Sequence, residues 1–507
     1  MHRILKLLFL IVLFAGLSDA AAQHINNPLN YSHQATLIGQ NQNSGDPASV
    51  ILPGTSFYSG FGSFMDNPAS MVFAGESYFQ FGLSNRSVSE DATFLSQTRN
   101  SRRTDNGLTN AGFIYNYPTV RGSLVIGAGY NQLSNFNRVL DIRGHNSRTT
   151  ITDAFKAEGS QYQEIAYNSY ATDIGDDFGD WDESIFRIGF DDIGDFPGIT
   201  QQGEIIERGA TGEYSIFLAT EFRERLMVGA SLGIVSGTYR YDRLFQEIDE
   251  ENIYDGEMIE GGTDIDRLTL DERLRTRFTG LRARAGLIYQ FSDHVSAGAS
   301  FTLPTLFEVD ETYDIGITTL MDNGDSFGDE TDSEFSYKVR YPSELSFGLG
   351  LYNYQGFSAS VSADLTNYSN TEVDFLESDF YDDERAENDF LQDNFDKVWS
   401  FRGGVSYDIH DAFTLRGGYA WIPTRFINGD DNRNVYSLGA GFGLTPTITL
   451  DISAQYTVWD ETSVVYEYAQ YDYTTLPENP PTYLYHSEDA FRAVDKLNLL
   501  ATIRFRM

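Results

Sequence analysis

Segments in which apolar and polar side chains alternate dominate the chain from about residue 76 to its end. The clearest lie at 226–234, 345–351 and 357–365, and we count fourteen segments of this kind. A period of two is typical of strands that face lipid on one side and a polar lumen on the other. The pattern therefore predicts an all-β fold, an antiparallel transmembrane β-barrel of 14 strands.

The connections between these segments are alternately short and long. Short ones lie at 118–121, 222–226, 291–294, 353–355, 409–412 and 445–447, and long ones at about 85–107, 132–210, 240–271, 307–334, 366–397, 422–434 and 460–491. Outer-membrane barrels have short periplasmic turns and long extracellular loops. We therefore expect a bacterial outer-membrane protein with both chain ends in the periplasm. A soluble β-propeller or sandwich also has many short strands, but it does not predict this asymmetry.

Residues 1–22 have the features of a secretory signal peptide. Arg3 and Lys6 precede an apolar run at 7–17, and the small residues 20–22 provide a cleavage site. A membrane-spanning helix is the alternative, but the run is shorter than the ~20 apolar residues that a bilayer requires. We therefore expect the chain to be exported and cut after residue 22.

Composition excludes several classes of function. The chain has no cysteine, so disulfides, thiol catalysis and thiolate metal ligands are absent. The formal net charge of -39 argues against a nucleic-acid partner, because phosphate binding requires a basic surface. The acids cluster in the long connections, but no cluster has the ligand spacing, fixed glycine and final glutamate of a calcium loop. We therefore expect a solvated acidic outer face and neither a metal nor a cofactor.

Residues 23–75 precede the first strand and lack the alternating pattern. They are rich in Asn, Gln, Gly and Ser, and a barrel of this size leaks unless its lumen is filled. We interpret them as an N-terminal hatch inside the lumen, and a disordered periplasmic tail is the alternative. The predicted organisation is a signal peptide at 1–22, a hatch at 23–75 and a barrel with long acidic extracellular loops at 76–507.

The end of the hatch carries the motif Asn67-Pro68-Ala69. It resembles the hatch motif of the FadL-type outer-membrane transporters of long-chain fatty acids and hydrocarbons, and the segments 127–131, 341–348 and 415–419 are also similar to that family. The resemblance implies passive transport of hydrophobic compounds through a plugged barrel. The connection 132–210 does not align with the family's capture loops, so no ligand residue there is carried over. A general porin or a surface-binding outer-membrane protein is the alternative.

The resemblance also implies a sideways exit through the wall near the third strand. Gly122, Gly127 and Gly129 lie in the segment that we assign to this strand. Glycine is where a strand can bend or bulge, so these residues are candidates for the opening. Close packing of a barrel wall is the alternative reason for their presence.

Four arginines are predicted to face the lumen, where a guanidinium group can bind a ligand carboxylate with two charge-assisted hydrogen bonds. They are Arg402, Arg416, Arg282 and Arg284. The alternation changes parity near Gly280, in the strand that carries the last two, which predicts a β-bulge. The alternative is that each arginine pairs with an acid of the hatch or lumen, such as Asp364, Asp408 or Asp451.

One Gly-x-Ser-x-Gly string, Gly229 to Gly233, suggests a hydrolase. It lies inside an alternating segment, whereas a nucleophile elbow requires a strand-to-helix turn, so we predict no catalytic residues and no enzyme activity. The expected ligand is a hydrophobic small molecule. We expect a monomer that also contacts outer-membrane lipid, lipopolysaccharide and the barrel-assembly machinery, although the closing strand ends in Met507 rather than in an aromatic residue.

Overall fold

The computed structural model describes residues 27–41, 45–155, 160–174, 182–186, 196–254, 264–376, 378–410, 412–427, 429, 431–472 and 482–507. The predicted signal peptide lies outside the described residues. Among the residues that are described, no helix is long and apolar enough to cross a membrane.

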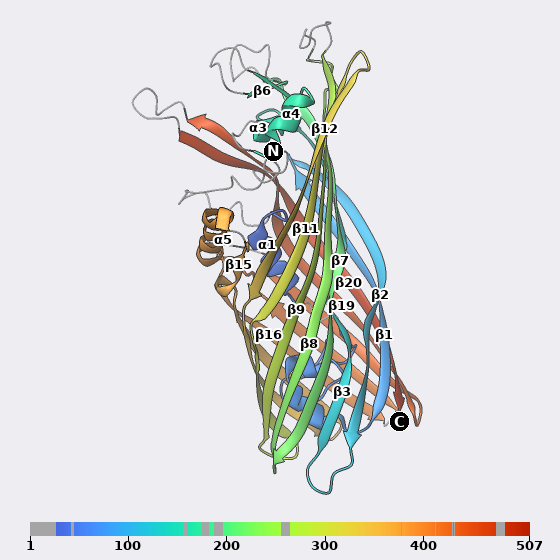
Figure 1. Cartoon of the computed structure of the whole chain (residues 1–507). Coiled ribbons are helices and arrows are strands. Elements are labelled where there is room, and N and C mark those ends of the chain that lie inside the picture. Colours follow the sequence, from blue (N-terminus) through green and yellow to red (C-terminus); the bar gives the residue numbers. More distant parts are fainter. Residues whose placement is uncertain are drawn as a thin grey trace.

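The wall is one antiparallel sheet that closes on itself (Figure 1). Strand β1 (Tyr78–Phe94) pairs with β2 (Gln97–Tyr117) on one side and with the last strand, β20 (Thr482–Arg506), on the other. The wall continues from β2 through β3 (Leu124–Asn135) and β4 (Arg138–Asn146) to β7 (Ile199–Arg223), β8 (Leu226–Ile248) and β9 (Ile265–Gln290).

Three further wall strands are interrupted. They are β10 (Val295–Thr302) with β11 (Thr305–Met321), β12 (Ser326–Tyr341) with β13 (Glu344–Tyr354), and β14 (Phe357–Asn367) with β15 (Glu372–Asp374). Pro304 and Pro342 stand at the first two breaks, because proline cannot donate a ladder hydrogen bond. Strands β16 (Lys397–His410), β17 (Phe413–Ile422), β18 (Arg433–Thr445) and β19 (Ile448–Asp472) complete the sheet. Strands β3 and β4, separated by a bend, also form one wall strand, so counting each of the four interrupted strands once gives the predicted 14 strands.

Several predicted loops are strand in the structure. Strands β1 and β2 are joined only by Leu95 and Ser96, although we expected a loop at 85–107, and β11 and β12 extend through most of 307–334. The strands continue past the lipid, where their outward side chains are polar and the apolar alternation no longer marks them. The remaining long connections hold α3 (Thr152–Phe155), α4 (Gln163–Asn168), β5 (Thr172–Ile174), β6 (Asp182–Ser184), η3 (Tyr368–Asn370), η4 (Ser378–Phe380) and α5 (Tyr381–Asn394).

Strand β9 shows how the wall passes from lipid into water. Leu281 points outward, is apolar and is 61% exposed. Arg277 also points outward, lies four residues further from the periplasm and is charged. Along the same stretch the inward side chains change from charged to apolar, from Arg282 to Phe278. The ladders to β8 and β11 show no register shift near Gly280, so the predicted bulge is wrong. The parity change marks the edge of the membrane, because apolar side chains turn inward once water surrounds the wall.

We call the wall beyond this edge, including 85–107, 236–254, 264–280 and 307–339, the outer barrel. The largest apolar cluster among the described residues extends through its interior, with buried side chains such as Phe245, Leu270, Ile317 and Val339. The wall is lower on one side, where β16 to β18 have 14, 10 and 13 residues against 25, 23 and 26 in β7 to β9. Figure 1 shows α5 and β15 beside this low side.

The described part of the segment 27–75 lies inside the barrel, as the blue elements in Figure 1 show. It contains α1 (Tyr31–Ile38), α2 (Ser63–Asp66) and the 3-10 helix η1 (Pro68–Ala74). Wall side chains hold its backbone: Ser296 Oγ donates to the Ser56 carbonyl at 2.8 Å and Ser360 Oγ to the Pro53 carbonyl at 2.7 Å. The described part of the segment therefore lies in the lumen and is hydrogen-bonded to the wall.

Candidate functional site

Asn67 fixes the end of the hatch to the wall. Its side-chain oxygen accepts a hydrogen bond from the Ala69 N–H at 3.0 Å, which caps η1 before Pro68. Its Nδ2 donates to the carbonyl oxygens of Thr55, Leu287 and Ala299 at 2.8, 3.1 and 3.3 Å. Asn67 is fully buried, so one side chain ties the hatch turn to β9 and β10.

Glycines form the socket for this motif. A Cβ atom on Gly286 would lie 1.9 Å from Asn67 Oδ1, and one on Gly298 would lie 1.9 Å from the Thr55 carbonyl oxygen. On β8, a Cβ at Gly229 would meet the Pro68–Ala69 peptide at 2.5 Å. Gly229 belongs to the Gly-x-Ser-x-Gly string of the sequence, and in the structure its backbone lies in close contact with the hatch. Gly286 and Gly298 were not singled out from the sequence.

A second anchor joins the hatch to the low side of the wall. Asp66 accepts a hydrogen bond from Arg402 at 2.8 Å and one from the Gly54 N–H at 2.7 Å. Arg402 also donates to Asp364 at 3.0 Å. Arg416, on the neighbouring strand, pairs with Asp451 at 2.7 Å.

The other two predicted arginines also face the lumen and bind the chain itself. Arg284 makes two hydrogen bonds to Glu213, at 2.5 and 2.8 Å, and Arg282 donates to the Gly39 carbonyl at 3.1 Å and to Thr305 Oγ1 at 3.0 Å. The inward orientation of all four predicted arginines agrees with the sequence. Three of the four are bonded directly to an acid and Arg282 lies 3.7 Å from Glu213, so the alternative of internal ion pairs describes them better than ligand binding.

The predicted glycines of the third strand have different environments. Gly122 lies in the periplasmic turn at a φ of +68°, not in β3, because its left-handed backbone suits a turn. Gly127 and Gly129 lie in β3 with ladder partners in both β2 and β7. A Cβ on Gly129 would lie 2.6 Å from the ring of Phe61, a hatch residue. The wall is therefore closed at these glycines.

Backbone pairing in the wall is interrupted just beyond them. Pairing of β2 with β3 stops at Asn110 and Asn131, and β4 pairs with β7 alone, so within the described strands no ladder joins β2 at 97–109 to β4. We call this gap in backbone pairing the seam. In the described strands the hydrogen bonds across it involve side chains, as when Asn135 Nδ2 donates to Asp105 Oδ2 at 3.0 Å.

A cavity of about 150 Å³ lies on the lumen side of the seam. It is lined by Leu37 and Gln40 of the hatch, by the bend 135–138 between β3 and β4, and by the outer ends of β17 and β18. Arg425 and Arg433 contribute cationic groups there, and Phe136 and Trp459 contribute aromatic rings. Arg425 is 8% exposed, and its Nε has no hydrogen-bond partner among the described residues. Arg425 was missed from the sequence because it follows the end of a strand, where alternation gives no direction.

A closed antiparallel barrel that encloses its own N-terminal segment and a cavity defines an outer-membrane transport barrel. The chain belongs to the outer membrane protein transport protein family (OMPP1/FadL/TodX), whose model matches residues 218–479. It is therefore a bacterial outer-membrane transporter of hydrophobic compounds and not an enzyme, as the sequence predicts.

Two solved structures show the same fold. The Pseudomonas putida toluene transporter TodX is 12% identical, with 92% of this chain and 98% of that chain covered and a TM-score of 0.50. A Pseudomonas aeruginosa FadL homologue is 11% identical, with 91% and 98% covered and a TM-score of 0.51. No curated protein matches the sequence.

Proposed function

We propose that the transported compounds are amphipathic carboxylates with long apolar chains, such as fatty acids. The observation that carries this proposal is Arg425, a buried cation in the wall of the cavity whose Nε lacks a hydrogen-bond partner. A buried polar group without a partner is costly, and an anionic head group would satisfy it. Apolar side chains such as Leu37, Phe136 and Val435 line the rest of the cavity and suit the chain of the ligand.

We propose a route that starts over the low side of the wall and leaves through the seam. The apolar core fills the outer barrel, so the cavity is best reached past Ile422 and Arg433, where β17 and β18 end. On the opposite side the cavity touches the bend 135–138, which flanks the seam. Residues 23–75 act as the plug that prevents an aqueous leak below the cavity.

The ligand class is tested with Arg425→Gln. Uptake of labelled oleate should require a higher concentration in this variant, because the head group loses its partner, whereas uptake of a neutral alkane should not change. Arg340→Gln is the matched control, since Arg340 is half exposed and pairs with Glu372 on the outside. Unchanged oleate affinity in Arg425→Gln would overturn the proposal.

The exit is tested by cross-linking the seam. The chain has no cysteine, so the double variant Asp105→Cys/Asn135→Cys carries the only thiols, at side chains that are hydrogen-bonded across the seam. A short thiol-cleavable cross-linker should stop oleate uptake, and reductant should restore it. Full uptake in the cross-linked protein would refute the sideways exit.

We further propose that the protein works as a monomer in contact with lipid and lipopolysaccharide after insertion by the barrel-assembly machinery. Outward apolar residues such as Phe79, Ile216 and Leu438 provide the lipid-facing surface. Outward Phe505 is the aromatic residue nearest to the end of the closing strand. Phe505→Ser should lower the amount of folded barrel in the membrane, and an unchanged amount would count against this role.

A further inference from the structure

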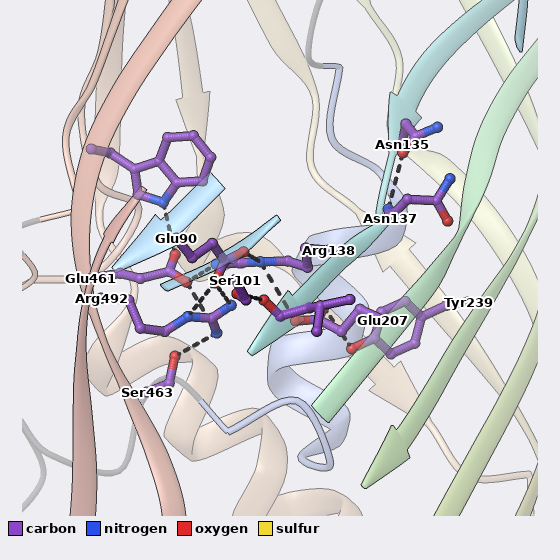
Figure 2. Close-up of polar contacts among 12 residues, drawn as sticks. Glu90, Ser101, Asn135, Asn137, Arg138, Glu207, Tyr239, Glu461, Ser463 and Arg492 are labelled. Atoms are coloured by element: carbon purple, nitrogen blue, oxygen red, sulfur yellow. Dashed lines mark hydrogen bonds and ion pairs between the residues drawn. The ribbon is translucent and has the colours of Figure 1, made fainter. Parts of the chain in front are cut away.

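Five charged side chains meet in the lumen where β4 begins (Figure 2). Arg138 Nε donates to Glu90 of β1 at 2.8 Å, and Arg138 Nη2 donates to Glu461 of β19. Arg492 of β20 binds the same two acids, with 2.9 Å from Nε to Glu90 and 3.3 Å from Nη1 to Glu461. Glu207 of β7 lies 3.8 Å from Arg138. We call these five residues the ion cluster.

The ion cluster bridges the seam from behind. Arg138 is the first residue of β4, which has backbone pairing only with β7. Its two strong partners lie in β1 and β19, beyond β2 on the other side of the seam. Closer to the outer surface, Ser101 Oγ of β2 donates to the Val139 carbonyl and Arg99 pairs with Asp141 at 3.3 Å, but that ion pair is about 40% exposed and weak. Arg138 is therefore the main charged link across the seam.

Burial makes these links strong and mutually dependent. The side chains of Glu90, Glu461 and Arg492 are 1%, 5% and 3% exposed. Burial alone would raise the pKa of Glu461, but attraction by Arg138 and Arg492 outweighs it and lowers this pKa. Three carboxylates share two guanidinium groups, so removal of either arginine leaves buried like charges close together. Arg138 also lines the cavity, where its side chain is 18% exposed.

We propose that the ion cluster is a latch on the seam, with Arg138 as the residue that holds β4 against β1 and β19. While the latch is closed, the bend 135–138 forms a wall of the cavity. When Arg138 leaves Glu90 and Glu461, β4 can move away from β2, since in the described strands β4 is laddered to β7 and no backbone ladder joins it to β2. The role of the latch in ligand exit rests on the proposed sideways route, whereas its effect on the seam does not.

The test measures the seam directly. Spin labels at Arg102→Cys on β2 and Asp141→Cys on β4 report the distance across it, and both positions are outward and accessible. In this background Arg138→Gln should lengthen and broaden the distance distribution. Arg143→Gln is the matched control, because Arg143 also lies in β4 but pairs with Glu250 near the end of β8. An unchanged distribution in folded Arg138→Gln would overturn the latch.

Transport provides an independent readout. If Arg138 makes a purely structural contact, its loss should slow oleate uptake. If Arg138 is a latch, its loss should raise the initial rate of uptake by at least about tenfold, the effect expected for the loss of one buried ion pair. Arg138→Lys keeps the charge but cannot bridge both acids, so it should lengthen the distance across the seam less than Arg138→Gln does. It replaces Arg138→Gln in the test if that variant does not insert into the membrane. A longer distance across the seam with no gain in uptake rate would support the latch and refute the sideways route. No change in either the distance or the uptake rate would refute the latch alone.

Discussion

Asn67→Ala tests the attachment of the hatch most directly. The substitution removes three hydrogen bonds donated by Nδ2 and one accepted by Oδ1. The two amide hydrogens are shared among three carbonyls, so the donated bonds are weaker than three separate ones. At about 1 kcal/mol net for each full bond, the loss is about 2–4 kcal/mol of docking free energy. The population of released hatch should therefore rise roughly 30- to 1,000-fold.

The barrel itself should survive, because its ladders do not include Asn67. A released hatch leaks ions, so we expect larger single-channel currents in planar bilayers. Oleate uptake should also fall, because Leu37 and Gln40 of the hatch form one wall of the cavity. Asn85→Ala is the matched control, since Asn85 bonds Asn106 on the exposed face. Unchanged currents and uptake at normal surface levels would refute the reasoning.

Two further predictions concern the socket and the outer barrel. Gly286→Val should release the hatch more completely than Asn67→Ala, because its Cβ would lie 1.9 Å from Asn67 Oδ1, and currents no larger than those of the unsubstituted protein would contradict this. Burial raises the pKa of Glu247, at the outer end of β8, to about 7 from the usual 4.5. The folded state then binds the proton more tightly, so the free energy of unfolding should fall by about 3 kcal/mol as pH rises through this interval and be constant above it. Melting temperatures measured across this range should show the fall, and Glu247→Gln should abolish it.

The membrane part of the fold was predictable because lipid imposes a local rule. Every second residue must be apolar, as at Leu345 and Phe347, and that rule is visible in a few residues of sequence. The outer barrel was missed for the same reason. Beyond the lipid, β12 carries acids such as Asp329 and Glu334 and has no apolar face that contacts lipid, so its sequence has the composition of a loop.

The candidate site was predictable only where a motif or parity was enough. Asn67-Pro68-Ala69 is a contiguous motif, and parity placed Arg284 in the lumen. Parity does not reveal that Glu213, 71 residues away, neutralises Arg284. Nor does any local signal show that Gly286 and Gly298 face the hatch, because that depends on which strands the hatch contacts after the barrel closes.

The pairing of Tyr78 with Arg506 has a consequence for assembly. It joins the first and last strands of the wall, which are far apart in the sequence. Such contacts form late, because closing a long loop costs conformational entropy before the contact can stabilise the fold. The hatch precedes β1 directly, so it can settle against β8 to β10 while the sheet is still open. A chain that lacks its last strand would keep two unpaired edges, and such edges pair with other chains. Truncation should therefore produce aggregates rather than a leaky pore.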